Sequence, residues 1–110
     1  MPKKFKVEFL DEALKYLRSL DQKVSDKILY NMDRASHENN PKLFKKLNND
    51  IWEFRTLYSG IQYRFLAFWD KSDDELTLVI ATHGYVKKTS KVAPKEIEKA
   101  EKLMMQYWEQ

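Results

Sequence analysis

Apolar and polar side chains alternate over residues 51–69, and this is the most regular pattern in the chain. The runs Ile51–Tyr58 and Ile61–Trp69 are rich in β-branched and aromatic residues, and Ser59-Gly60 lies between them. Alternation with a period of two is typical of a strand with one buried face, and a short loop containing glycine between two such runs is typical of a β-hairpin. The pattern therefore predicts a hairpin at the centre of the fold.

The predicted hairpin brings two arginines together. A loop centred on Ser59-Gly60 places Phe54 opposite Phe65 on an apolar face. The same register places Arg55 opposite Arg64 on the other face. Because like charges that face each other across strands cost up to about 1 kcal/mol, this placement does not stabilise the fold, and we interpret the pair as a candidate anion-binding site. Two independently solvated arginines, or a three-residue loop that shifts the register, are the alternatives.

Weaker patterns predict the remaining strands and the last helix. Residues 5–9 alternate and predict a first strand, and residues 43–47 predict a short extended segment. The apolar run Leu76–Thr82 is typical of a buried central strand. A helix is expected to begin near Pro94, since proline suits the first helical position.

Two amphipathic helices are expected between the first strand and the extended segment. Asp11 is a candidate N-cap for a helix over residues 11–20, and Asp21 is a candidate N-cap for a second helix that ends before Pro41. The short joint favours an antiparallel helical hairpin, and a single bent helix is the alternative.

The order of these elements indicates an α+β fold. We expect an N-terminal strand and helical hairpin packed on a mostly antiparallel sheet, followed by a C-terminal helix. A chain of 110 residues is long enough for one modest core, so we expect a single domain over residues 1–110.

Composition excludes several classes of protein. A hydrophobic content of 43% and an aromatic content of 14% argue against disorder, and no apolar run reaches the roughly 18 residues of a membrane span. The absence of cysteine excludes disulfides and thiolate zinc sites, and only two histidines are present. We therefore expect a cytoplasmic protein with neither metal nor cofactor. The net charge of +3 is a mild bias toward polyanions.

A second register extends the arginine pair into a larger group. If Trp69 pairs near Leu76, His83 lies opposite Gln62 on the next strand. One face of the sheet then carries a carboxylate, two permanent cations and the one side chain that titrates near neutral pH: Glu53, Arg55, Arg64 and His83. A change of one residue in the intervening loop would move His83 to the other face.

This set of side chains suits cleavage of RNA. RNA carries its own nucleophile, the 2′-hydroxyl, so the protein needs a base, cations for the charge that builds on the phosphate, and an acid for the leaving oxygen. His83, Glu53, Tyr85 or a lysine with a lowered pKa could transfer the protons. Each group also has a purely structural interpretation. His83 could be a hydrogen-bonded residue at a strand end, and the pairs Lys45-Lys46 and Lys87-Lys88 could be solvated charge.

Three motifs resemble the RelE/ParE superfamily of toxins, and the likeness is nearest to its phage-derived, HigB-like branch. They are Trp52-Glu53-Phe54-Arg55, then Gly60-x-x-Tyr63-Arg64-x-Leu66, then His83-Gly84-Tyr85-Val86-Lys87-Lys88-Thr89 with Pro94-x-Glu96-Ile97-x-x-Ala100 downstream. The resemblance covers nearly the whole chain, since the helical hairpin before the sheet also fits. The branch usually has phenylalanine at the position of Tyr85.

The resemblance implies the toxin of a type II toxin–antitoxin pair, an endoribonuclease that cuts mRNA on the ribosome and inhibits translation. It implies a cognate antitoxin, often with a DNA-binding domain. The residues that it assigns to catalysis are Arg55, Arg64, His83, Lys88, Glu53 and Tyr85. Those that it assigns to RNA binding are Lys45, Lys46 and Lys87. It leaves the general base unassigned. A ParE-like inhibitor of DNA gyrase and a non-catalytic binding module are the alternatives, because fold does not decide function.

Overall fold

A computed structural model describes residues 3–110 of the chain, and these residues form a sheet with helices on both sides. The elements, in chain order, are β1 (Lys6–Phe9), α1 (Asp11–Ser19), α2 (Gln22–His37), β2 (Phe44–Lys46), β3 (Trp52–Tyr58), β4 (Ile61–Asp70), β5 (Leu78–Val86) and α3 (Pro94–Trp108). Their types and order confirm the predicted α+β fold. Two separate helices follow β1, so the single bent helix is wrong.

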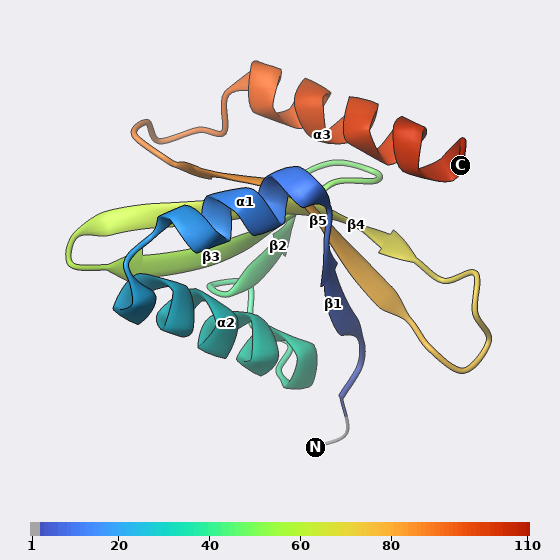
Figure 1. Cartoon of the computed structure of the whole chain (residues 1–110), viewed down its shortest axis with the longest axis horizontal. Coiled ribbons are helices and arrows are strands. Elements are labelled where there is room, and N and C mark those ends of the chain that lie inside the picture. Colours follow the sequence, from blue (N-terminus) through green and yellow to red (C-terminus); the bar gives the residue numbers. More distant parts are fainter. Residues whose placement is uncertain (1–2) are drawn as a thin grey trace.

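The sheet has the strand order β1-β5-β4-β3-β2. Strand β1 runs parallel to β5, and the other neighbouring strands are antiparallel. Helices α1 and α2 lie on one face of this sheet and α3 lies on the other, so the molecule has three layers (Figure 1). None of the helices within residues 3–110 is long and apolar enough to cross a membrane.

One of the two predicted N-caps is wrong and the other is confirmed. Leu10 occupies the N-cap position of α1, and Asp11 is the first residue of the helix. Asp21 is the N-cap of α2 as predicted, but its side chain makes no capping hydrogen bond. Apolar periodicity shows that a helix is present, whereas its first residue depends on local backbone geometry. Asp11 and Glu12 still stabilise α1, because carboxylates in the first turn face the positive end of the helix dipole.

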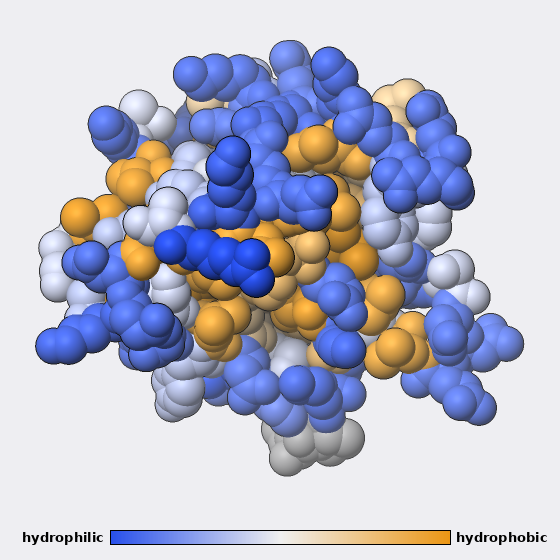
Figure 2. All heavy atoms as spheres, in the orientation of Figure 1, coloured by the Kyte–Doolittle hydropathy of each residue, from blue (hydrophilic) through white to orange (hydrophobic). Residues whose placement is uncertain are grey.

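Each face of the sheet buries its own apolar core. The core under α1 and α2 contains Phe54, Phe65 and Ala81, and the smaller core under α3 contains Leu66 and Phe68. On the side seen in Figure 2, polar side chains cover most of the surface, and apolar surface shows between α2 and β1. A cavity of about 260 Å³ lies there.

The hairpin of β3 and β4 has the register predicted from the sequence. Phe54 pairs with Phe65 and Arg55 pairs with Arg64. The turn residues Ser59 and Gly60 both have positive φ, at 50° and 78°. A two-residue loop with positive φ at both positions has a twist that matches the twist of the flanking strands, and it fixes their register. The arginine pair therefore shares one face of the sheet.

The predicted register between β4 and β5 is wrong. His83 lies opposite Leu66 and not opposite Gln62, and Tyr85 lies opposite Arg64. The strand also continues to Val86, beyond the predicted end at Thr82. A long apolar run marks a buried strand but contains no signal for where its pairing begins, and the polar loop before it is longer than a tight turn.

A β-bulge at Thr82 determines the face on which His83 lies. Ala67 pairs with Ala81 while its neighbour Leu66 pairs with His83, so Thr82 is an extra residue in β5. An extra residue reverses the face on which the following side chains point. Ala81 accordingly belongs to the core under α1 and α2, whereas His83 contacts α3 on the opposite face.

Gly84 is required by the close packing of α1 against the sheet. A Cβ atom at this position would lie 2.8 Å from the ring of Phe65 and would overlap the ring of Tyr16. Phe65 is buried in the core under α1 and Tyr16 packs against that core, so the two rings leave no space for a side chain at this position. The absence of a side chain lets α1 approach the end of β5, where the strand carries Tyr85.

Candidate active site

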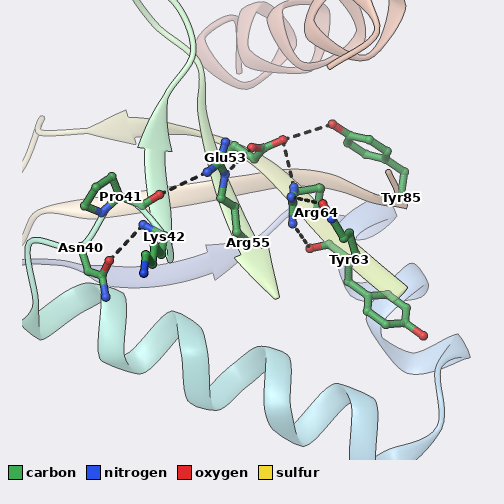
Figure 3. Close-up of polar contacts among 9 residues, drawn as sticks. Asn40, Pro41, Lys42, Glu53, Arg55, Tyr63, Arg64 and Tyr85 are labelled. Atoms are coloured by element: carbon green, nitrogen blue, oxygen red, sulfur yellow. Dashed lines mark hydrogen bonds and ion pairs between the residues drawn. The ribbon is translucent and has the colours of Figure 1, made fainter. Parts of the chain in front are cut away.

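A buried carboxylate holds the two arginines in place. Glu53 is fully buried, and its Oε1 accepts a hydrogen bond of 2.9 Å from Nε of Arg55. Its other oxygen, Oε2, lies 3.5 Å from Nε of Arg64 (Figure 3). Because one carboxylate neutralises only one of two cations, the group keeps an excess positive charge. We call Glu53, Arg55, Arg64 and Tyr85 the arginine cluster.

Arg64 is a buried cation with incomplete partners. It is 7% exposed, and its Nη2 donates a hydrogen bond of 2.5 Å to Oε1 of Gln62. The 3.5 Å contact with Glu53 is an ion pair without hydrogen-bond geometry, so Nε of Arg64 is left with no hydrogen-bond partner. Burial lowers the pKa of Arg64, and the Glu53 charge opposes that effect. This nitrogen is closed to solvent and faces Glu53, so Arg64 is a buried cation whose hydrogen bonds are incompletely satisfied.

Tyr85 lies beside the arginines on β5. Its hydroxyl is 3.5 Å from Oε2 of Glu53 (Figure 3). The Tyr85 residue is half-buried. Burial raises the pKa of Tyr85 well above its usual range, and the Glu53 charge adds to this effect. The phenol therefore keeps its proton at neutral pH, and it can donate a proton or a hydrogen bond but cannot serve as a base.

His83 lies on the face of the arginine cluster, but it is buried under α3. It is 2% exposed, its Nε2 lies 3.1 Å from Oε1 of Glu96, and its Nδ1 lies 3.0 Å from the hydroxyl of Thr82. In a neutral imidazole, Nε2 donates to Glu96, and the single proton of the Thr82 hydroxyl is donated either to Nδ1 or to the backbone carbonyl of Leu66, which lies 3.1 Å from it. Burial and these contacts leave neither ring nitrogen open to a substrate. His83 was one of several candidates for proton transfer, and its burial argues against that role.

The burial of His83 predicts that the fold is less stable in mild acid. Burial lowers the pKa of His83, and the hydrogen bond to Glu96 partly opposes this effect. Lys99, which pairs with Glu12 of α1, lowers the pKa further. In the unfolded chain histidine has a pKa of about 6.5, so as the pH falls the unfolded chain binds a proton at a higher pH than the folded chain does. The free energy of unfolding should therefore fall as the pH drops below about 6.5, by at most about 1.4 kcal/mol per pH unit for one proton.

Urea unfolding between about pH 7 and pH 5 measures this effect. The variant His83→Gln should lose the His83 contribution, so that its free energy of unfolding changes less over this range. If the wild type and His83→Gln give parallel pH profiles, the buried histidine is not the group that titrates.

The lysines predicted to bind RNA divide into two groups. Lys45 lies opposite Glu53 and shares the face of the arginine cluster, whereas Lys46 lies opposite Trp52 and shares the other face. Lys87 is half-buried at the end of β5, and burial lowers its pKa, with Arg64 and other nearby cations adding to the effect. Lys88, which we expected to be catalytic, is exposed. The structure thus brings Lys45 and Lys87 toward the arginine cluster and leaves Lys46 outside it.

Three residues that the sequence analysis did not assign to the site support it. Gln62 accepts the hydrogen bond from Arg64, Thr82 forms the bulge and contacts His83, and Glu96 holds His83 from α3. Glu96 belongs to the motif Pro94-x-Glu96-Ile97-x-x-Ala100, which resembles the toxin family. Its role as the partner of His83 depends on a contact between α3 and β5. Among residues 3–110, no group of three or more His, Asp or Glu side chains is arranged to hold a metal ion.

Comparison with known proteins identifies the family. Residues 15–105 match the family described as phage-derived protein Gp49-like. None of the curated proteins matches the chain. The family is associated with RelE-type toxins of toxin–antitoxin systems, which agrees with the toxin-like resemblance without specifying the HigB-like branch. Since the match covers most of the sequence, the chain belongs to the Gp49-like family of phage-derived proteins.

Proposed function

We propose that the protein is the toxin of a type II toxin–antitoxin pair, of the HigB-like branch, and that it cleaves mRNA on the ribosome. The observation that carries this proposal is the arginine cluster. Arg55 and Arg64 face each other across the hairpin with one carboxylate between them, which leaves an excess of positive charge. A phosphate bound at the pair would supply the missing negative charge and interact with both guanidinium groups.

The proposed reaction needs only groups that the RNA and this face of the sheet provide. The 2′-oxygen loses its proton to a base and attacks the adjacent phosphorus, and the bond from phosphorus to the 5′-oxygen breaks. The products are a 2′,3′-cyclic phosphate and a 5′-hydroxyl, which takes up a proton from an acid. Arg55 and Arg64 stabilise the charge that develops on the phosphate oxygens.

The structure favours particular groups for the two proton transfers. Lys87 is the proposed base, because its lowered pKa increases the neutral fraction of its amine. Tyr85 is the proposed acid, because it keeps its proton and lies in the arginine cluster. Glu53 is proposed to position the arginines, and His83 to position the end of β5 under α3. Lys45 and Lys88 bind RNA in this scheme.

The proposed partners follow from the same function. A cognate antitoxin, with a DNA-binding domain that represses the shared operon, would neutralise the toxin. The ribosome and its mRNA would be the target, and the protein would act in the cytoplasm, where translation occurs.

Ribosome profiling with mapping of RNA 5′ ends after induced expression tests this proposal. We expect cuts in translated mRNA within the ribosomal A site and an early halt in protein synthesis. Enzymatic analysis of the ends should find 2′,3′-cyclic phosphate or 3′-phosphate. DNA damage before any change in translation would instead support a gyrase inhibitor. Toxicity with neither mRNA cuts nor DNA damage would support a binding module.

A further inference from the structure

A cavity bordered by lysines lies next to the arginine cluster. Its volume is about 260 Å³, and it lies between the end of β5 and the start of α3. The residues that line it include Tyr85, Lys87, Lys88, Lys91, Lys95 and Glu96. We call this cavity the lysine pocket. Tyr85 belongs both to the lysine pocket and to the arginine cluster, so the two sites are adjacent.

The lysine pocket has more positive charge than its own acids neutralise. Within residues 3–110, Lys87, Lys88, Lys91 and Lys95 form no ion pair shorter than 4.0 Å, whereas Lys99 on the same helix pairs with Glu12. The one acid that lines the pocket is Glu96, and its Oε1 already contacts His83. Four ammonium groups that border one cavity repel each other, and a bound anion would reduce that repulsion.

The start of α3 adds a second source of positive potential. Its N-cap residue, Ala93, makes no side-chain capping hydrogen bond, and Pro94 follows at the first helical position. The backbone N–H of Lys95 is thus the first free donor of the helix, while the N–H of Glu96 is bonded to the carbonyl of Ala93. Because these residues line the pocket, the positive end of the helix dipole lies at its wall.

The pairing of the strands shows where the lysine pocket lies relative to the arginine cluster. Tyr85, Arg64 and Arg55 pair across β5, β4 and β3, so they form a row perpendicular to the strands. Lys45 of β2 lies on the same face beyond the Arg55 end, opposite Glu53 and so two residues away from the row along the strand. Tyr85, at the other end of the row, lines the lysine pocket. An RNA strand carries one phosphate per nucleotide. A strand that runs along this row with one phosphate between the arginines would bring its neighbouring phosphates toward these two ends.

We propose that the lysine pocket binds a backbone phosphate of the RNA next to the phosphate that is cleaved, with Lys91 and Lys95 as the ligands farthest from the arginine cluster. This inference rests on the proposed function, since it takes the substrate to be a single strand of RNA. It adds α3 to the substrate-binding surface. The same lysines would also bind free inorganic phosphate, and the experiment below distinguishes a phosphate of RNA from free phosphate.

The salt dependence of RNA binding tests the proposal. The probe is a short single-stranded RNA with methylated 2′-hydroxyls, which cannot be cleaved by the proposed reaction. In the double variant Lys91→Ala/Lys95→Ala, the slope of log Kd against log salt should fall by about 0.7, since the pocket holds one phosphate and each phosphate contact on a single strand contributes about 0.7. The corresponding loss of affinity is about 5-fold at about 0.1 M salt.

Two control variants make the result specific. Lys15→Ala/Lys23→Ala removes the same charge from exposed positions on α1 and α2 and should leave the slope unchanged. Lys91→Arg/Lys95→Arg keeps the charge and should keep the slope. An equal loss in Lys15→Ala/Lys23→Ala would overturn the proposal, because the effect would then come from net charge alone.

The remaining outcomes distinguish failure of the pocket proposal from failure of the proposed function. If the wild type cleaves mRNA but Lys91→Ala/Lys95→Ala binds the RNA probe with an unchanged slope, the pocket is not a subsite and the function stands. If the wild type neither binds the probe nor cleaves mRNA, the proposed function fails as well. Titration with inorganic phosphate at constant ionic strength gives the last comparison. An amide shift at Lys95 with an unchanged RNA slope would assign the pocket to free phosphate and overturn the RNA subsite.

Discussion

Replacement of Arg64 by alanine is expected to lower the rate of mRNA cleavage by about 10²–10³-fold, the usual cost of losing one donor that stabilises developing charge. Arg64 is the buried member of the arginine pair, and its Nε has no hydrogen-bond partner in the protein. A buried cation acts at a lower effective dielectric constant than an exposed one, so its loss should affect the transition state strongly. The measurement is the initial rate of cleavage of ribosome-bound mRNA by purified protein.

Two further variants show whether the loss comes from the site. Arg64→Lys keeps the positive charge but loses the planar fork of donors, so it should recover only part of the rate. Arg18→Ala removes an exposed arginine from α1, on the other side of the sheet, and should cleave at the wild-type rate. Circular dichroism must show that Arg64→Ala is folded. A folded Arg64→Ala that retains full activity would rule out the arginine pair as the phosphate site.

The hairpin was predictable because its signals are local. Alternation over residues 51–69 identifies the two strands, and the turn at Ser59-Gly60 fixes their register without help from the rest of the chain. The opposition of Arg55 and Arg64 follows from that register alone. For the same reason, amphipathic periodicity was sufficient to place the helices to within a few residues.

The position of His83 was not predictable because it depends on a bulge and on a distant helix. The sequence gives no local sign that Thr82 is an extra residue, and the register deduced without it was wrong. His83 nevertheless reaches the face of the arginine cluster, since the bulge turns it away from the core under α1. Its burial depends on Glu96 of α3, a contact that only the tertiary structure reveals.

The role of Glu53 also depends on burial. In the sequence it is one acid among many on an alternating strand, and both a catalytic and a structural role were open. In the structure it is fully buried with two arginines beside it, so it has no exposed oxygen with which to accept a proton from substrate. We therefore interpret Glu53 as the residue that holds Arg55 and Arg64 together despite their mutual repulsion.

Replacement of Glu53 by glutamine should destabilise the fold by about 3–5 kcal/mol, the usual cost of removing one partner from a buried ion pair. The amide has nearly the same shape as the carboxylate, so the loss reflects charge and not volume. Without the carboxylate, the buried Arg64 keeps its desolvation cost and faces Arg55 with no anion between them. The measurement is the free energy of unfolding from urea denaturation.

A matched control and a double variant show whether burial is the cause. Glu38→Gln breaks the exposed ion pair between Arg34 and Glu38, which has the same chemistry, and it should change stability little. In Glu53→Gln/Arg64→Met, no buried guanidinium remains on β4 to be compensated, so part of the lost stability should return. If Glu53→Gln cost no more than Glu38→Gln, the carboxylate would not be what holds the arginines together. The two like charges would then have to be stabilised by the surrounding strands alone.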